Sequence, residues 1–331
     1  MKETKIVVIY AGDDWEKETP FASEFTRKSF EDWHIRGMKR GILFFRASIS
    51  WYDLREKVFT KSWAFRDGKW IKINEPIKPD LIFDKVAGVK DYDLFGMKEK
   101  IAKDVPIFNH PLFRTMYNSK LSQALIFKKY MAKTGLALDE KDYKKRTKKI
   151  PGDKLVIKPI YGSGGNGIVI DDRKNIDPGF LEYPCIIQEF IESNVGIPGF
   201  SEKEEVADLR MVFINHKLIY ALSRIAKQGS LFTNFHQGAT AVLVPENKIP
   251  ENAYKMAKKI IKQLSVFSHA HYSLDFIFKN NGDPMLVEMN TTPGFDLLYF
   301  LGNKQVVDDN FIKFIKTADA IIKSYNKIKA K

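Results

Sequence analysis

A chain of 331 residues with 44% hydrophobic residues exceeds the usual size of one domain, so we expect two or three domains with substantial cores. Its 54 basic and 41 acidic residues leave a net charge of +13, which favours anionic partners such as nucleotides, phosphorylated metabolites or acidic peptides. A single cysteine excludes an intramolecular disulfide framework, and no apolar run suits a signal peptide or a membrane span, so we expect a cytoplasmic protein without a membrane partner.

The first part of the chain, residues 1–115, has the alternating pattern of a small α/β domain. An apolar run at 6–10 predicts a buried strand, and residues 20–36 show helical spacing that we expect Gly37 to end. Further strands are expected at 42–47, 58–65, 70–73 and 81–86. The Asp67-Gly68 pair between two of these runs predicts an inserted hairpin.

The character of the sequence changes near residue 116, where we place the start of a second unit, 116–191. Its apolar spacing predicts one helix over 118–135. Strands are expected to follow at 155–160, 167–170 and 185–191. Cys185 lies in the last of these apolar runs, so we interpret it as a buried side chain and not as a nucleophile.

The third unit, 192–331, is expected to begin with a loop over 192–207, where glycine, proline and an acidic run occur together. Strands at 209–215 and 217–226 are predicted to join at Asn215-His216. The remaining elements expected here are a helix at 251–267, a hairpin of strands 272–278 and 284–290, and a helix at 308–328. The alternation of strands and helices predicts an α/β protein.

The loop GSGGNG at 162–167 matches the pattern G-x-G-x-x-G, which indicates a dinucleotide site only where the loop opens a helix. Here β-like runs stand on both sides, so the loop is predicted to be the tip of a hairpin. It also lacks the Gly-Lys-Ser/Thr ending of a Walker A loop. We expect a flap whose backbone N–H groups, with Ser163, close over phosphate oxygens near the Lys158 ammonium. An ordinary glycine-rich turn is the alternative.

The hairpin near the C-terminus carries three oxygen-bearing side chains, Asp275, Glu288 and Asn290. Glu288 and Asn290 point to the same face of one strand, and pairing across the turn can bring Asp275 alongside them. Oxygen donors without Cys or His suit magnesium, which keeps its other positions for phosphate and water. The alternative is a set of solvated strand positions, although a carboxylate among apolar neighbours is costly without a cation or hydrogen-bond partner.

Cationic side chains lie between the glycine loop and this hairpin. Arg210 and Arg224 are expected on consecutive strands, where they could stabilise charge that develops when a carboxylate attacks a γ-phosphate. The structural alternative is an ion pair of Arg210 with Asp208 or a nearby Glu. The lysine-rich runs 141–149 and 323–331 are interpreted as solvated surface, because they lack the interleaved aromatic residues that single-strand binding needs. We therefore do not expect nucleic acid as a partner, and a homo-oligomer stays open.

Six motifs in this order resemble the ATP-grasp superfamily, and within it the RimK-type ligases, the group that contains the ribosomal-protein glutamate ligase. Glutathione synthetases are more distantly similar. The motifs are NSK at 118–120, VIKPIYGSGGNGI at 156–168, QEFI at 188–191, DLR at 208–210, SRIAKQG to TNFHQG at 223–238, and LDFIF to LVEMNTTPG at 274–294. The resemblance covers residues 116–322. It implies an N-terminal α/β pre-ATP-grasp domain followed by a two-subdomain ATP-grasp fold of α+β type.

The resemblance implies an ATP-dependent ligase that joins a carboxylate to the amine of an amino acid or peptide through an acyl phosphate, releasing ADP and phosphate. The nucleotide site that it implies, with the flap, comprises Lys120, Lys158, Ser163, Gly164, Gly165, Gly167, Gln188, Glu189, Phe190, Ile191 and Asp208. Catalytic contacts to the phosphates are implied for Arg210, Arg224 and Asn234. Asp275, Glu288 and Asn290 are implied to bind one or two Mg²⁺ ions, with Mn²⁺ as an alternative.

Two features depart from this family pattern. RimK-type chains commonly carry Arg-Gly-Gly after the histidine of the TNFHQG stretch, where this chain has Gln237, Gly238 and Ala239. The connection from Phe190 to Asp208 is also longer than usual. These departures leave the substrate open. Two other functions also stay open: an ATP-grasp kinase of a phosphorylated small molecule, which a basic surface would suit, and a non-catalytic binder of nucleotides or nucleic acid, which the net charge of +13 would suit.

Overall fold

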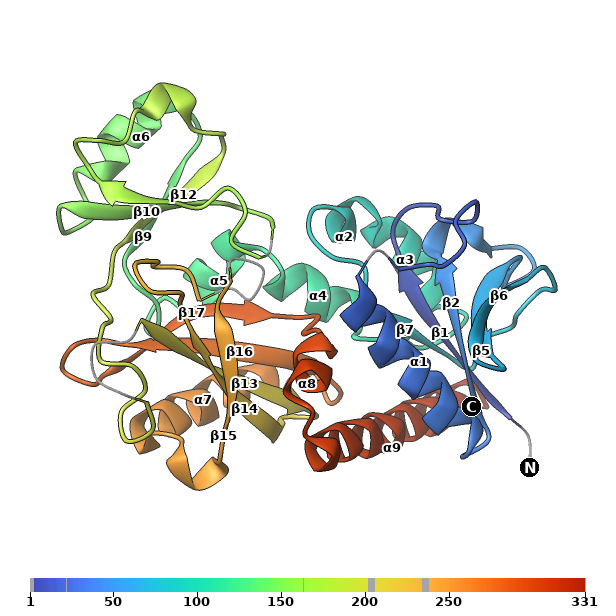
Figure 1. Ribbon diagram of the computed structural model, residues 1–331. Helices are drawn as coiled ribbons and strands as arrows, with labels where there is room; N and C mark the ends of the chain where they lie inside the picture. Colours follow the sequence, from blue (N-terminus) through green and yellow to red (C-terminus); the bar gives the residue numbers. More distant parts are fainter. Residues whose placement is uncertain (1–2, 22, 163, 202–205, 234–237, 331) are drawn as a thin grey trace.

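The chain begins with a six-stranded sheet of order β6-β5-β2-β1-β7-β8, seen on the right of Figure 1. The computed structural model describes residues 3–21, 23–162, 164–201, 206–233 and 238–330. β1, β2, β7 and β8 are parallel, and the β5–β6 hairpin extends one edge, so the predicted α/β opening with an inserted hairpin is confirmed. The elements are β1 (Thr4–Tyr10), α1 (Glu24–Met38), β2 (Ile42–Ser48), η1 (Ile49–Trp51), β3 (Tyr52–Asp53), β4 (Val58–Phe59), β5 (Ser62–Arg66), β6 (Lys69–Ile73), β7 (Leu81–Asp84), α2 (Lys90–Asp93), α3 (Phe95–Ala102), β8 (Ile107–Phe108) and α4 (Pro111–Tyr117).

The first helix differs from its prediction at both ends. α1 starts after Ser23, whose hydroxyl accepts a hydrogen bond from the Thr26 N–H, and it runs through Gly37 to its end at Met38. A Cβ at Gly37 would lie 2.8 Å from the Phe44 ring, so this glycine serves close packing of the helix on β2 and does not stop the helix. The predicted strand at 58–65 is likewise divided into β4 and β5.

The second part is a four-stranded antiparallel sheet of order β11-β10-β12-β9. Its elements are α5 (Lys120–Ile126), β9 (Thr134–Ala137), α6 (Glu140–Thr147), β10 (Lys154–Pro159), β11 (Val169–Asp172), η2 (Pro178–Phe180) and β12 (Cys185–Glu189). The predicted helix over 118–135 is wrong in its length, because α5 ends at Ile126. Beyond it, Phe127 enters the core, and the Tyr130 carbonyl accepts a hydrogen bond from the Leu286 N–H, which draws the chain toward β17 (Pro284–Asn290).

The third part contains a five-stranded antiparallel sheet of order β15-β14-β13-β16-β17. Its elements are β13 (Ala207–Ile214), β14 (Lys217–Ile225), β15 (Thr240–Val244), η4 (Glu246–Lys248), α7 (Glu251–Leu264), β16 (His271–Phe278), β17 (Pro284–Asn290), α8 (Asp296–Leu301) and α9 (Lys304–Lys329). Asn215 and His216 have φ of 51° and 62°, the left-handed values of a tight hairpin turn, so the predicted β13–β14 hairpin is confirmed. The β16–β17 hairpin turns at Gly282, also as predicted.

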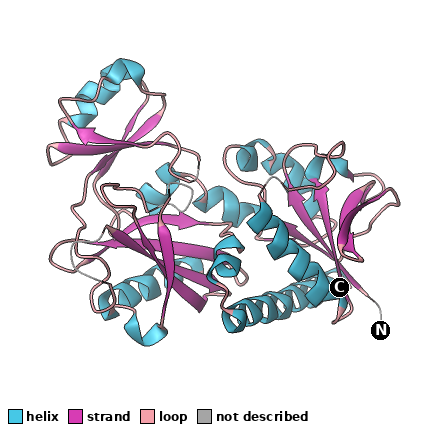
Figure 2. Cartoon of the chain, viewed as in Figure 1, coloured by secondary structure: helices cyan, strands magenta, loops and turns pink. Residues whose placement is uncertain are grey.

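The C-terminal helices return to the N-terminal sheet, as Figures 1 and 2 show. The Trp33 ring of α1 stacks on Phe295 with centroids 4.3 Å apart, and Phe311 and Phe314 of α9 enter the same core. The predicted boundaries at 115 and 191 stay a prediction, but this packing joins the first and last parts of the chain. None of the described helices has the length and apolarity needed to cross a membrane.

Candidate functional site

A row of charged side chains crosses one face of the five-stranded sheet. Glu288 of β17 lies directly opposite Asp275 of β16, and Asp275 lies opposite Arg210 of β13. Asp208 lies two residues before Arg210 and opposite Arg224 of β14. Directly opposed residues of antiparallel strands share a face, so the register brings these side chains together. The sequence-based prediction that Asp275 and Glu288 meet across the hairpin is confirmed.

Asp275 accepts four hydrogen bonds, two at each carboxylate oxygen. Arg210 donates through Nε at 2.9 Å and Nη2 at 2.6 Å, and the Arg224 Nη2 donates at 2.8 Å. The fourth donor is the Ser273 hydroxyl at 3.2 Å. A carboxylate offers about four such positions, so Asp275 has none to spare in this arrangement. Although burial raises the pKa of Asp275, the two guanidinium groups hold it below the usual range.

Asp208 and Arg224 form a second buried pair beside Asp275. The Arg224 Nε donates to Asp208 at 2.8 Å, and the Thr233 hydroxyl also donates to Asp208. Burial raises the pKa of Asp208 against the opposing effect of Arg224. Arg210 does form an ion pair, as the structural alternative expects, but its partner is Asp275 and not Asp208 or a nearby Glu.

The glycine loop is the tip of the β10–β11 hairpin, as predicted, and it faces the charged row. Gly162, Gly164, Gly165 and Gly167 all have positive φ, between 71° and 126°, which glycine adopts without strain. The Lys120 Nζ donates to the Gly162 carbonyl at 2.7 Å and lies 3.6 Å from the Glu288 carboxylate. A small cavity of about 70 Å³ lies between the loop and the charged row. Its polar lining includes Lys120, Lys158, Asp208, Arg224, Asp275 and Glu288.

A larger cavity of about 420 Å³ adjoins this small one and shares Lys158, Asp208 and Thr233 with it. Its apolar lining includes Val156 and Ile170 of the four-stranded sheet and Leu286 of the five-stranded sheet, with Phe190, Ile191 and Phe232 from connecting segments. Gln188 also lines it, but the Gln188 Oε1 accepts from Lys158 Nζ at 2.7 Å, so this amide holds the lysine in place. Burial lowers the pKa of Lys158 to about 8. A flat apolar group beside a polyanion fits this pair of cavities.

The comparisons with known proteins agree with this geometry. The model of the RimK-like ATP-grasp domain matches residues 118–315. The chain belongs to the RimK-like ATP-grasp family. A protein from Vibrio atlanticus named "Probable alpha-L-glutamate ligase" is 28% identical over 180 residues, which cover 54% of this chain and 56% of that protein. The chain thus spans about half the length of the curated relatives it matches.

Solved ATP-grasp structures match nearly the whole chain in fold. D-alanyl-alanine synthetase A from Vibrio cholerae has a TM-score of 0.65 at 13% identity, covering 98% of this chain and all of that one. A RiPP-associated ATP-grasp ligase from Chryseobacterium gregarium has a TM-score of 0.57 at 17% identity, covering 96% of this chain and 97% of that one. At these identities the likeness concerns the fold alone, and it includes the N-terminal α/β domain, which the sequence motifs did not cover.

Predictions for several other residues can be compared with the structure. Ser163 and Asn234, with His236 and Gln237, lie outside the described residues. Glu189 lines the larger cavity while its carboxylate accepts from the Lys133 N–H at 3.3 Å. Cys185 is buried and free, and burial raises its pKa to about 11, which agrees with a structural thiol.

Sequence reasoning missed two polar partners of the charged row, Ser273 and Thr233. Ser273 lies two residues before Asp275 on one strand, so the two-residue period could have placed it on the same face. Thr233 reaches Asp208 from a different segment, and no local pattern signals that contact.

Proposed function

We propose that this RimK-like ATP-grasp chain is an ATP-dependent ligase that joins a carboxylate to the amine of an amino acid or peptide. In this proposal the carboxylate attacks the γ-phosphate, which gives an acyl phosphate and ADP, and the amine then displaces phosphate. The observation that carries it is the charged row beneath the glycine flap, next to an apolar cavity of about 420 Å³. Arg210 and Arg224 would stabilise charge on the transferred phosphoryl group, and Lys120 and Lys158 would hold the phosphates.

The three predicted metal ligands carry the oxygen atoms that magnesium prefers, although Asp275 must release a hydrogen bond before it can bind the ion. Asp275 and Glu288 share a face, and Asn290 lies two residues after Glu288 on the same strand. Bound magnesium would neutralise charge between the nucleotide phosphates. Among the described residues, no three His, Cys, Asp or Glu side chains form a cluster suited to a metal, and the proposed set is two carboxylates with the Asn290 amide. Because four donors already occupy Asp275, we infer that an arginine hydrogen bond is released when that carboxylate binds a metal.

The activity can be tested with ATP, magnesium and a panel of amino acids and short peptides. L-Glutamate is the first amine to test, because the curated relatives are named for it. A ligase should release ADP only with both substrates, and a carboxylate labelled with oxygen-18 should transfer label to phosphate. Unlabelled phosphate from a substrate that is turned over would contradict an acyl phosphate. A stable phosphate ester formed without an amine would instead identify a kinase, and salt-dependent nucleic-acid binding without ADP release would identify a binder.

Nucleotide binding should be accompanied by proton uptake at Lys158. The pKa of this buried lysine is about 8 in the free protein, below its ordinary value of 10.5, so near pH 9 the side chain is mostly neutral. Phosphate oxygens stabilise the ammonium and raise this pKa, so binding at pH 9 should take up close to one proton. Calorimetric titration with ADP in buffers of different ionisation enthalpy measures this uptake.

The matched variant for this measurement is Lys158→Arg. A guanidinium keeps its charge at pH 9, so the uptake should fall toward zero while binding persists. Equal proton uptake by the wild type and Lys158→Arg would assign the proton to another group.

A further inference from the structure

The backbone directly after Glu288 is held by side chains that come from outside the five-stranded sheet. β17 ends at Asn290, and residues 291–295 connect it to α8. Lys85, Asn109 and Gln123 each contact the main chain between Met289 and Pro293, and we call these three side chains the 289–293 clamp. None of them was singled out by a sequence motif as a site residue, and none lines the two cavities.

Gln123 of α5 grips the residue that stands between the two predicted metal ligands of β17. Its Oε1 accepts from the Met289 N–H at 2.9 Å, and its Nε2 donates to the Met289 carbonyl at 2.8 Å. The same Nε2 donates to the Tyr117 carbonyl at 2.7 Å. Gln123 therefore pairs with the outer edge of β17 as a neighbouring strand would, and its exposed fraction is only 1%.

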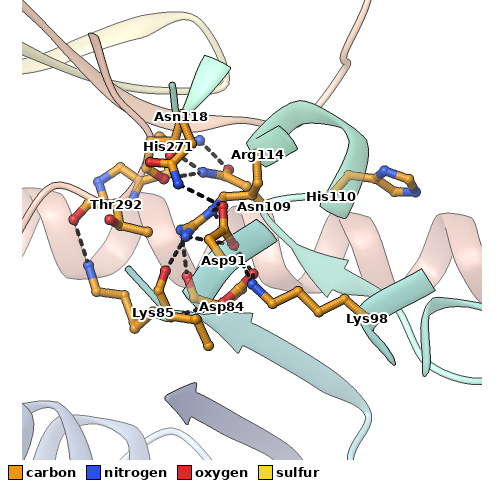
Figure 3. A network of polar contacts seen from close by, with 12 residues as sticks. Asp84, Lys85, Asp91, Lys98, Asn109, His110, Arg114, Asn118, His271 and Thr292 are labelled. Atoms are coloured by element: carbon orange, nitrogen blue, oxygen red, sulfur yellow. Dashed lines mark hydrogen bonds and ion pairs between the residues drawn. The ribbon is translucent and has the colours of Figure 1, made fainter. Parts of the chain in front are cut away.

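Asn109 and Lys85 hold the turn that follows, as seen in Figure 3. The Asn109 Nδ2 donates to the Thr291 carbonyl at 2.8 Å and to the His271 carbonyl at 2.6 Å. Its Oδ1 accepts from the His271 N–H at 2.7 Å. The Lys85 Nζ donates to the carbonyls of Thr292 at 3.2 Å and Pro293 at 2.9 Å. The start of β16 and the end of β17 are thereby tied together from the N-terminal side.

Lys85, the first residue of the clamp, is itself held in place by its surroundings. The Lys85 N–H donates to the Ile9 carbonyl at 3.0 Å, which continues the β1–β7 ladder. Asp84, next to it, accepts from the Lys98 Nζ at 2.6 Å in a buried network that includes Asp91 and Arg114 (Figure 3). A buried, fully paired network of this kind makes a rigid support.

We propose that Lys85, Asn109 and Gln123 are positioning residues that set the orientation of Glu288 and Asn290 toward the phosphates. Their contacts lie on both sides of Asn290, whose own Oδ1 accepts from the Thr292 N–H at 2.8 Å. A shift of the held turn therefore moves this amide directly. Residues that orient metal ligands typically change metal affinity by about 10–100-fold when they are replaced. This inference rests on the magnesium site of the proposed function.

The simpler role for these contacts is to join the domains, and a matched variant separates the two roles. Arg36 of α1 forms an ion pair with Asp308 of α9, which also joins the N-terminal domain to the C-terminal part. It has no contact with residues 289–293 among its hydrogen bonds and ion pairs. Arg36→Met therefore weakens only the contact between the N-terminal domain and α9. Lys85→Met removes two hydrogen bonds to the backbone of residues 292–293 with little change in side-chain length.

The test measures Mn²⁺ binding to each full-length variant in the presence of ADP, by the loss of the free-ion signal in electron paramagnetic resonance. Lys85→Met should raise the Kd for Mn²⁺ by about 10–100-fold, and Arg36→Met should leave it within about twofold of the wild type. Wild-type affinity in Lys85→Met, or an equal loss in Arg36→Met, would overturn the inference alone. Two other results would overturn both the proposed metal site and this inference. One is a wild-type protein that does not bind Mn²⁺, and the other is a Glu288→Gln variant that binds Mn²⁺ as tightly as the wild type.

A second variant keeps the inference testable if Lys85→Met does not fold. Gln123→Met removes the three hydrogen bonds made by the Gln123 side-chain amide. It should weaken Mn²⁺ binding to the same degree as Lys85→Met. It should also speed amide hydrogen exchange in a peptide covering residues 286–295 of the metal-free protein, because the Met289 N–H loses its acceptor. Unchanged exchange together with unchanged Mn²⁺ affinity would show that the clamp does not position this strand.

Discussion

Replacing Glu288 with Gln should lower the kcat for substrate-dependent ADP formation by about 10²–10³-fold, the cost typical of removing one preorganised charge-stabilising group. The side chain lies opposite Asp275 and 3.6 Å from the Lys120 ammonium, in the cavity that the glycine flap covers. The amide keeps the size of the side chain but removes the charge that would hold a hard cation. Steady-state kinetics at saturating ATP, at the magnesium concentration that saturates the wild type, measure the effect, and a higher magnesium concentration should recover part of it.

The control for this prediction is Asp283→Asn on the same hairpin. Asp283 is an exposed carboxylate at the turn between β16 and β17, and it lines neither of the two cavities. Its replacement with Asn therefore removes one negative charge from the hairpin and leaves the lining of both cavities unchanged. The kcat of Asp283→Asn should stay within about twofold of the wild type, because solvent and salt screen an exposed charge outside the site. Comparable losses in Asp283→Asn and Glu288→Gln would mean that net charge on the hairpin, and not a metal ligand, governs the rate.

Replacing Arg224 with Met should lower the free energy of unfolding by about 3–5 kcal/mol, because it leaves buried carboxylates without their cation. Arg224 donates to Asp208 and Asp275, and the exposed fractions of these two residues are 3% and 1%. Asp275 keeps Arg210, so the greater part of the cost should fall on Asp208. Urea unfolding followed by far-ultraviolet circular dichroism measures the change at neutral pH.

Two further variants show whether an uncompensated charge causes this loss. Lys217→Met removes an exposed cation from the same strand and should change the free energy of unfolding by less than about 0.5 kcal/mol. The double variant Arg224→Met with Asp208→Leu should recover a large part of the stability, since paired apolar replacement of buried ions is often neutral. A double variant that is less stable than Arg224→Met would show that packing around Asp208 dominates instead.

The local patterns of the sequence predicted hairpins well and helix lengths poorly. The β13–β14 and β16–β17 hairpins follow from two-residue alternation and from turn residues that accept positive φ, both of which are local properties. The helix expected over 118–135 instead ends at Ile126, because the burial of Phe127 and the pairing of Tyr130 with Leu286 depend on a distant strand. Gly37 resembles a helix stop in the sequence, but it packs against the Phe44 ring of β2. That contact also depends on a separate element of the fold and cannot be predicted from the local pattern.

The ATP-grasp motifs, the hairpin flap and the set of charged residues can be predicted from the chain's residue types and short spacings alone. The pairing of those charges, in contrast, depends on the three-dimensional arrangement of the strands. Arg210 and Asp275 are 65 positions apart, and Lys85 and Pro293 are 208 apart, so strand order and domain docking bring them together. The four donors on Asp275 and the 289–293 clamp arise from those distant contacts, and no periodicity along the chain encodes them.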